Sequence, residues 1–274
     1  MGKGPRRGPG ASAPGAGGGG GEGRVPFGAL DIPVAEKTPR VRALFERVAP
    51  RYDLMNDLMS GGLHRLWKAA CVDWLRPRPD LRIADVAGGT ADMALRMVRH
   101  MGGARAVAGA GGGVAVIDIN PAMIAVGAAR VAARGMAGAV SFACADAEAL
   151  PLADGGLDAY VIAFGLRNVT RPDRALAEAR RVLAPGGRFL CLEFSQPRWP
   201  LVGPAYRRYS EAVLPWLGGA VAGDAEAYRY LADSIRRFPG QEALAAMIAE
   251  AGLGEVRVRN LSGGIAAMHS AWRI

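Results

Sequence analysis

The chain has 274 residues, half of them hydrophobic, which predicts one α/β domain with additions. No apolar run is long enough to cross a bilayer, and neither the three cysteines nor the three histidines have metal or disulfide spacing, so no metal site is expected and a reducing compartment is indicated. The net charge of +9 suggests acidic partners, but no basic run is interleaved with aromatic residues, which argues against nucleic acid. An anionic membrane surface and a merely solvated basic surface stay as alternatives.

The N-terminal residues 1–26 are rich in glycine, alanine and arginine and are expected to be a disordered tail. They lack the apolar core of a secretory signal and the serine-rich amphipathic pattern of a transit peptide. This favours the bacterial cytoplasm over the mitochondrial matrix. An ordered domain is expected over residues 27–274.

Residues 38–71 follow a helical pattern, with apolar positions such as Val41, Leu44 and Phe45 on one face. The segment continues as YDLMNDLMS (Tyr52 to Ser60) and GGLHRLWK (Gly61 to Lys68). Its leucines and methionines would ordinarily be core residues, but polar side chains are mixed closely among them. A helical lid that lays apolar side chains over a ligand would need such a mixture.

The chain is organised around RIADVAGGTAD (Arg82 to Asp92), a short strand, a glycine turn and the start of a helix. This arrangement cradles adenosine-containing cofactors. Gly88 and Gly89 let a ligand approach the backbone N–H groups, and Asp85 inside the strand is expected to orient the turn or to reach the ligand. The spacing departs from G-x-G-x-x-G, so the loop could serve NAD, FAD or S-adenosylmethionine, or be an ordinary tight turn.

Further polar residues follow later strands of the predicted sheet. Asp118 ends the strand Val114 to Ile119 and is suited to bind ribose hydroxyls. Asp146 follows the strand Val140 to Ala143 and could accept a hydrogen bond from an adenine amino group, with Ala147 leaving room for the ring; a loop or cap role is its alternative. The connection Gly102 to Gly113 is expected to be flexible.

The strand Leu157 to Phe164 leads into GLRNV, which presents Arg167 and Asn168 where α/β sheets place their sites. A fifth strand covers Arg188 to Phe194, residues 201–238 are a helical insertion, and strands near Val256 to Asn260 and Ala267 to Arg273 finish the chain. The pattern predicts a seven-stranded, mostly parallel sheet with an antiparallel last strand and added helices.

At these motifs the chain closely resembles the ubiquinone/menaquinone biosynthesis C-methyltransferase family of Rossmann-like class I S-adenosylmethionine-dependent methyltransferases. The resemblance spans roughly residues 27–274 and rests on YDLMNDLMS with HRLWK, DVAGGT, DIN, DAEALP, FGLRNVT, LAPGGRFLCLEFS, YRYLADSIRRFP and SGGIAAMHSAW. The first of these and FGLRNV are specific to the family, whereas glycine loops are shared by many methyltransferases.

The resemblance implies S-adenosylmethionine as cofactor, with Thr90 in the cofactor loop, Asp118 on the ribose and Asp146 with Ala147 beside the adenine. Ala163 occupies a cofactor-side position where some members have serine. The family pattern has glycine where this chain has Ala91, and the added methyl should be tolerated if φ is negative there.

The implied reaction is C-methylation of a polyprenylated methoxy-benzoquinol or of demethylmenaquinol. Arg167 is the candidate for assisting phenol deprotonation, through a water or by stabilising the phenolate, and a structural ion pair is its alternative. Asn168 and Tyr52 are candidate orienters of the substrate.

The prenyl tail of such a substrate implies further contacts. It would be walled by residues 201–238 or held at a membrane, which implies a cytoplasmic enzyme peripheral on the inner membrane of a bacterium, or on the matrix side in a eukaryote. The same apolar residues could equally form a homodimer face, and other quinone-biosynthesis proteins are further expected partners.

Three rival functions stay open. A methyltransferase acting on another small aromatic molecule would bind the cofactor without converting demethylated quinols. A noncatalytic quinone-pathway scaffold would fold normally but bind the cofactor weakly. A nicotinamide dehydrogenase is disfavoured by the glycine spacing.

Overall fold

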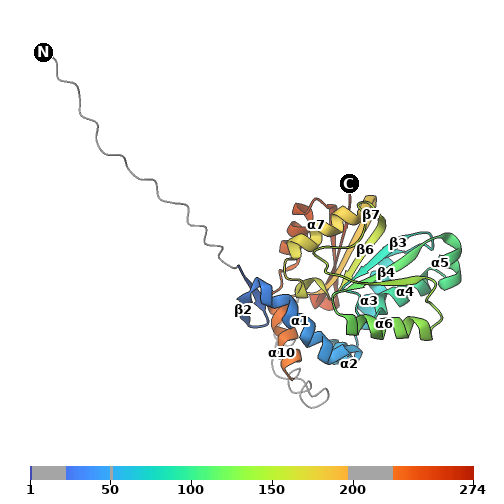
Figure 1. The fold of residues 1–274 in the computed structure, drawn as a ribbon, viewed down its shortest axis with the longest axis horizontal. Helices are drawn as coiled ribbons and strands as arrows, with labels where there is room; N and C mark the ends of the chain where they lie inside the picture. Colours follow the sequence, from blue (N-terminus) through green and yellow to red (C-terminus); the bar gives the residue numbers. More distant parts are fainter. Residues whose placement is uncertain (2–22, 50–51, 197–224) are drawn as a thin grey trace.

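The computed structural model describes Met1 and residues 23–49, 52–196 and 225–274, and its centre is a seven-stranded sheet (Figure 1). The strand order is β5-β4-β3-β6-β7-β9-β8, and every neighbouring pair is parallel except those that β9 makes with β7 and β8. The strands are β3 (Arg82–Val86), β4 (Gly113–Asp118), β5 (Val140–Cys144), β6 (Leu157–Ala163), β7 (Leu183–Phe194), β8 (Gly254–Leu261) and β9 (Ala266–Trp272). The predicted fold class, including the antiparallel last strand, is confirmed.

The central strands are apolar on both faces because helices cover both. Along β3, Ile83 belongs to one hydrophobic cluster, whereas its neighbours Ala84 and Val86 belong to the other. The first cluster includes residues of α3 (His64–Leu75), α4 (Asp92–His100) and α6 (Pro121–Ala133), and the second includes residues of α7 (Pro172–Val182) and α11 (Gln241–Glu250). This three-layer packing fixes the register of the parallel strands and so the position of every strand end.

The prediction of a flexible connection over residues 102–113 was wrong, because it contains α5 (Ala104–Ala110). Gly103 and Gly111 flank this helix, and Gly111 adopts the left-handed conformation that commonly ends helices. Alanine has the highest helix propensity, and Val107 is fully buried. One buried apolar residue was too weak a periodic signal to reveal the helix.

A strand also lies before the predicted start of the domain at residue 27. Residues 2–22 lie outside the described residues, but Arg24–Phe27 forms β1, which pairs with β2 (Leu30–Pro33), so the predicted tail of residues 1–26 is wrong for its last residues. Phe27 packs against Tyr230, with ring centroids 4.6 Å apart. A contact between residues 203 positions apart in sequence could not be read from the local pattern.

The helical segment predicted over residues 38–71 consists of α1 (Val34–Val48), α2 (Tyr52–Ser60) and α3. Figure 1 shows α1 and α2 gathered with α10 (Ala225–Arg237) at one end of the molecule. Of the predicted helical insertion, residues 201–224 lie outside the described residues and the remainder is α10. Among the described helices, none combines the length and apolarity needed to cross a membrane.

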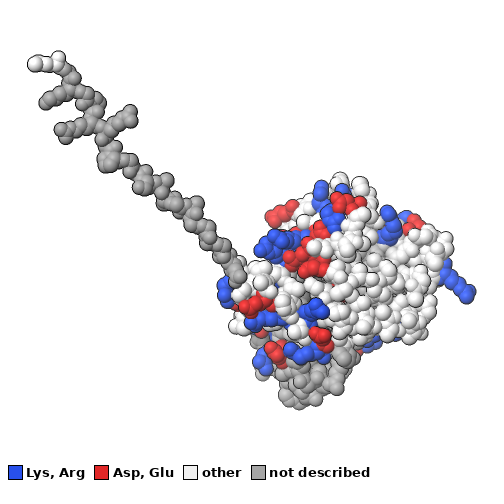
Figure 2. Space-filling view, viewed as in Figure 1, with Lys and Arg blue, Asp and Glu red and all other residues white. Residues whose placement is uncertain are grey.

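The surface in the view of Figure 2 carries acidic and basic side chains interspersed over the side of α1 and α7, whereas the side of α5 and α6 is mostly uncharged. The net positive charge of the chain is therefore not gathered into one basic patch on this face.

Candidate functional site

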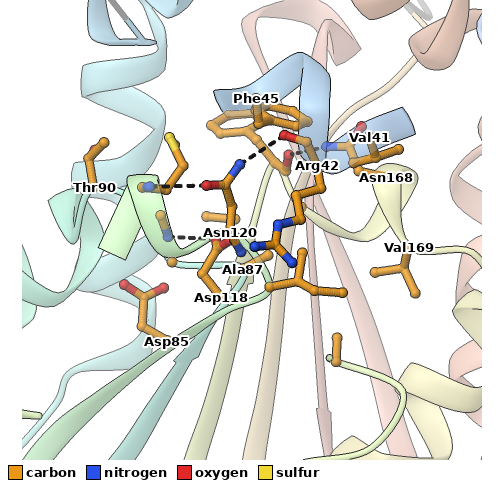
Figure 3. Close-up of a pocket in the computed structure, with 18 of the residues that line it drawn as sticks. Val41, Arg42, Phe45, Asp85, Ala87, Thr90, Asp118, Asn120, Asn168 and Val169 are labelled. Atoms are coloured by element: carbon orange, nitrogen blue, oxygen red, sulfur yellow. Dashed lines mark hydrogen bonds between the residues drawn. The ribbon is translucent and has the colours of Figure 1, made fainter. Parts of the chain in front are cut away.

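A cavity opens at the carboxyl ends of β3, β4 and β6, where the turns that follow these strands meet residues of α1 and α2. Figure 3 shows Phe45 and Arg42 of α1 on one side of this cavity and Asp85 and Asp118 on the other. The cavity is lined by all the predicted cofactor-binding residues, which are Asp85, Gly88, Gly89, Thr90, Asp118, Asp146, Ala147 and Ala163. Parallel strands bring these residues together because their carboxyl ends share one edge.

The glycine turn is tightly packed against the protein itself. A side chain at Gly88 would place its Cβ 2.7 Å from the carbonyl oxygen of Asp85, and one at Gly89 would lie 2.9 Å from Cε of Met123. Gly89 also has φ of +51°, in the left-handed region that favours glycine. Glycine is therefore favoured at Gly88 by packing against the backbone and at Gly89 by the backbone conformation.

Asp85 is almost fully buried at the end of β3. Its Oδ2 accepts a hydrogen bond from the Ala94 N–H at 3.1 Å, which ties β3 to α4, whereas its Oδ1 has no partner. Burial raises the pKa of Asp85 to about 7, although the charge of Lys68 opposes the rise. A buried carboxylate oxygen without a partner, in the wall of a cavity, is suited to a cationic or hydrogen-bond-donating ligand.

Asp118 supports the glycine turn from the neighbouring strand β4. Its Oδ2 accepts the Gly89 N–H at 2.9 Å and its Oδ1 accepts the Asn120 N–H at 2.9 Å. Burial raises the pKa of Asp118 to about 6, against the lowering effect of these backbone donors. Each carboxylate oxygen can accept a second hydrogen bond, so the group can also receive hydroxyl donors from the cavity.

Asp146 makes a local hydrogen bond and also faces the cavity. Its Oδ1 accepts the Glu148 N–H at 2.9 Å, which is a local turn hydrogen bond, and its side chain also lines the cavity next to the buried Ala147. The loop role and the ligand-facing position are therefore compatible.

Ala91 does not meet the condition under which its methyl group was expected to be harmless, because its φ is +62°. It is fully buried and occupies the N-cap position of α4 in the left-handed conformation. The glycine that the family has at this position would avoid the steric cost that alanine has there. Tolerance of this methyl group was expected only with a negative φ, so the structure predicts a steric cost for it instead.

The three candidate catalytic residues have different surroundings. Tyr52 and Asn168 line the cavity, whereas Arg167 is not among its lining residues. Arg167 lies in η2 (Leu166–Asn168), and its Nη1 is 2.9 Å from Oε2 of Glu193 in an ion pair that is 2% exposed on both sides. Nη1 also donates to the carbonyl of Phe164, and Nε has no partner.

Asn168 is held in one orientation by a residue of α10. The Tyr230 hydroxyl donates to Oδ1 of Asn168 at 3.1 Å, and Nδ2 of Asn168 lies 3.5 Å from the Phe164 carbonyl. Because Oδ1 is occupied, the amide nitrogen is the donor left for a ligand in the cavity.

Several cavity residues were not predicted as site residues. The largest group comes from α1, and Asn120 connects it to the cofactor loop by donating to the Arg42 carbonyl at 3.0 Å. Lys68 of HRLWK is buried beside the cavity and pairs with Asp92 at 3.0 Å. The cavity-lining residues that the prediction omitted include Thr38, Val41, Arg42, Phe45, Lys68, Asp92, Asn120 and Val169. The position of Lys68 in the matched motif HRLWK was a sequence signal for a site residue. The α1 residues gave no such signal, because their place at the cavity depends on how that helix docks.

His64, the histidine in HRLWK, is a structural residue. Its Nε2 lies 2.9 Å from Oδ1 of Asp57, and its backbone N–H donates to Oγ of Ser60, which joins α2 to α3. Burial lowers the pKa of His64, against the raising effect of Asp57. The side chain is not part of the cavity lining.

Comparison with known proteins identifies a family and close relatives. Residues 34–273 match the family described as the ubiE/COQ5 methyltransferase family. The chain is 55% identical, over 90% of its length and 96% of the relative, to the "Ubiquinone/menaquinone biosynthesis C-methyltransferase UbiE" of Methylobacterium nodulans. It is 52% identical to the protein of the same name from Acidiphilium cryptum, over 91% and 97% of the two chains.

Solved structures share the fold at low sequence identity. A SAM-dependent methyltransferase from Thermotoga maritima has a TM-score of 0.57 at 19% identity, covering 85% of this chain and all of that one. The [4+2]-cyclase SpnF has a TM-score of 0.60 at 20% identity, covering 86% and 96%. One fold thus serves two kinds of chemistry, and the site residues have to decide the function.

Proposed function

Because this chain belongs to the ubiE/COQ5 methyltransferase family, we propose that it transfers the methyl group of S-adenosylmethionine to a ring carbon of a prenylated benzoquinol or of demethylmenaquinol, in ubiquinone and menaquinone biosynthesis. The observation that carries the proposal is one continuous cavity that joins the strand-end carboxylates to Tyr52 and Asn168.

The residues of the cavity fit the cofactor. The free Oδ1 of Asp85 and the second acceptor positions of Asp118 match the ammonium and ribose hydroxyl donors of S-adenosylmethionine, and Asp146 with Ala147 can flank its adenine. Lys68 of α3 lines the cavity, pairs with Asp92 at 3.0 Å, and offers a cation for the carboxylate of the methionine moiety. When bound, the cofactor supplies an electrophilic sulfonium methyl group.

The protein's part in the reaction is to position the nucleophile. A quinol carbon becomes nucleophilic when its hydroxyl loses a proton, and the Nδ2 donor of Asn168 can stabilise the phenolate oxygen that results. Tyr52, whose ring lies 6.0 Å from that of Phe45, can orient the aromatic ring of the quinol. Holding carbon and methyl in near-attack geometry supplies several kcal/mol of the barrier reduction, roughly 7–11 in well-oriented systems.

Arg167 is proposed as a positioning residue. Its ion pair with Glu193 and its bond to the Phe164 carbonyl hold η2 against β7, and Asn168 is the next residue in the chain. The role is thus indirect and acts through Asn168.

Contact with a membrane surface is proposed for the prenyl tail, because a long apolar tail is unfavourable in water. Three of the exposed large apolar side chains, Leu54, Leu63 and Leu66, lie in the α2–α3 segment. Leu66→Gln should lower sedimentation with neutral phosphatidylcholine vesicles, and an unchanged bound fraction would contradict this contact.

The proposed function is tested by quinone profiling and by direct assay. A cell that lacks this protein should accumulate the demethylated quinone precursor, and the purified protein should methylate that precursor with S-adenosylmethionine. Cofactor binding without turnover of either quinol would assign the chain to a methyltransferase of another aromatic substrate. Weak cofactor binding by well-folded protein would favour a noncatalytic scaffold.

A further inference from the structure

A second hollow lies away from the cofactor cavity and shares none of its residues. Arginine and tryptophan side chains dominate its lining, with Asp73 as the one acidic residue. They come from the end of α3, the beginning of β7, the strand β8 and the end of β9, and they are Trp74, Arg76, Arg188, Arg257, Arg259 and Trp272. Long-range packing thus gathers four guanidinium groups that are scattered in the sequence.

The two indole rings organise the guanidinium groups. The Cζ of Arg259 lies 4.3 Å from the ring centroid of Trp74, and the Cζ of Arg257 lies 5.7 Å from that of Trp272. Arg188 lies between the rings, with its Cζ 5.5 Å from the centroid of Trp74 and 5.0 Å from that of Trp272. Stacked guanidinium groups keep their in-plane N–H donors available for another ligand.

Arg188 is fixed at the centre of this group. Its Nη1 donates to the Trp74 carbonyl at 2.6 Å and its Nε donates to Oγ of Ser270 at 3.0 Å. Burial lowers the pKa of Arg188, and the neighbouring charges of Arg259, Arg76 and Arg257 lower it further. Three of the charged groups that act on Arg188 are therefore arginines of the same hollow.

The available acids do not neutralise the cluster. Among the described residues, Arg76 and Arg259 have no salt-bridge partner, and Arg257 reaches only the exposed Glu255, at 3.5 Å. Arg76 also has φ of +51° at the C-terminus of α3, a position that glycine usually occupies. The positive charge of the exposed Arg76 and Arg259 is therefore available to an anionic ligand.

From these contacts we infer that the hollow between α3 and the β8–β9 edge is a binding site for a phosphate-bearing anion, held by the stacked guanidinium groups. Guanidinium groups bind phosphate oxygens in pairs of parallel hydrogen bonds, and the indole rings hold the donors in place. The same chemistry would bind a free diphosphate or the headgroup of an anionic lipid.

The inference is tested with inorganic pyrophosphate as the probe. Titration calorimetry on the full chain at low salt measures the affinity for pyrophosphate. Arg257→Gln with Arg259→Gln should weaken binding at least tenfold. Arg105→Gln with Arg134→Gln removes the same charge from exposed positions in α5 and just after α6, and should leave binding within twofold of the original. Melting curves establish that both double variants are folded.

Two further measurements show where the anion binds and whether it is a lipid headgroup or a free phosphate compound. Quenching of tryptophan fluorescence by pyrophosphate, lost in Trp74→Leu, would place the anion in this hollow. Sedimentation with phosphatidylglycerol vesicles that pyrophosphate displaces would assign a lipid headgroup as its source, and pyrophosphate binding without vesicle binding would assign a free phosphate compound. No saturable pyrophosphate binding, or equal losses in the two double variants, would overturn the inference.

Discussion

Three residues other than glycine hold a positive φ at or beside the cofactor cavity. Ala87 at +51° and Phe164 at +58° line the cavity, and the fully buried Ala91 at +62° directly follows the lining residue Thr90. Each such conformation costs of the order of 1–3 kcal/mol and persists only where the surrounding packing fixes it. At Ala87 and Phe164 the conformation turns the chain sharply out of β3 and β6, so the backbone following each strand faces the cavity. The strain is thus concentrated where the ligand is expected.

Replacing Ala91 with glycine tests this strain directly. Ala91→Gly should raise the free energy of unfolding by about 1 kcal/mol, because glycine adopts the left-handed conformation without a Cβ clash. Denaturant unfolding measures the change. The matched control is Ala132→Gly, at an exposed position inside α6, which should instead lower stability by about 0.5–1 kcal/mol. Loss of stability in both variants would contradict the strain.

Asp85 should make cofactor affinity depend on pH. Its pKa is raised from 3.8 to about 7, so the side chain becomes neutral as the pH falls through 7 and loses its attraction for a cationic ligand. Affinity for S-adenosylmethionine should therefore fall severalfold, up to about tenfold, between pH 8 and pH 6. In Asp85→Asn this dependence should be reduced to the part contributed by Asp118, whose pKa is about 6. Calorimetry at several pH values measures both, and a flat profile in the original chain would contradict the assignment.

The raised pKa of Asp85 also predicts that the protein becomes less stable as the pH rises toward 7. Between pH 3.8 and 7 the folded protein holds a proton on Asp85 that the unfolded chain has released, so this group's contribution to stability is present at low pH and is lost as the pH rises through 7. Asp85→Asn should flatten that part of the stability profile.

The buried Arg167–Glu193 ion pair is expected to stabilise the fold and to position Asn168. Arg167→Ala leaves a buried carboxylate without its cation and should cost about 3–5 kcal/mol of stability. A positioning role further requires that Arg167→Lys, which keeps the charge, lowers turnover while cofactor affinity stays within twofold. Single-turnover assays measure the rate of the chemical step, and calorimetry measures the affinity for the cofactor. Unchanged turnover would remove Arg167 from the mechanism.

At the scale of elements, α1 is fastened to the loop that follows η2. Nζ of Lys37 donates to the Val169 carbonyl at 2.8 Å, and the hydroxyls of Thr38 and Thr170 lie 2.9 Å apart. Burial lowers the pKa of Lys37 to about 8, against the raising effect of Glu148. Because Asn120 holds the other part of α1, the helix is attached on both sides of the cavity that it lines.

Loosening this attachment should affect substrate binding. Thr38→Val removes one hydrogen bond and should cost about 0.5–1.5 kcal/mol, with a severalfold higher KM for the quinol because α1 lines the cavity. The control on the same helix is Glu36→Gln with Arg40→Gln, an exposed pair that should change stability by less than about 1 kcal/mol. Steady-state kinetics of both variants measure the effect, and equal changes in KM would contradict a role for the attachment.

At the scale of the whole molecule, the reactivity of the cysteines tests whether α3 stays packed on the sheet. Cys71 of α3 and Cys191 of β7 are fully buried, and burial raises the pKa of the Cys71 thiol to about 12, whereas Cys144 is exposed. A thiol reagent should therefore modify Cys144 rapidly, and should modify Cys71 and Cys191 only when the protein unfolds. Mass spectrometry over time measures this. Rapid modification of Cys71 would show that α3 separates from the sheet without global unfolding.

The sequence by itself determined the strands of the sheet, the crossover helices and the acids at the strand ends. Alternating buried strands and amphipathic helices specify a parallel sheet, and in such a sheet the strand order brings Asp85, Asp118 and Asp146 to one edge. Those features are encoded locally, by periodicity and by the residues that follow each strand.

Only the tertiary structure decided the backbone conformation of Ala91, the burial of Arg167 against Glu193 and the docking of α1 over the cavity. It also decided the gathering of four arginines around Trp74 and Trp272. Each of these depends on contacts between segments distant in the chain, or on a φ angle that distant packing imposes. Local sequence patterns carry neither kind of information, because the energies that fix them arise only when the layers pack together.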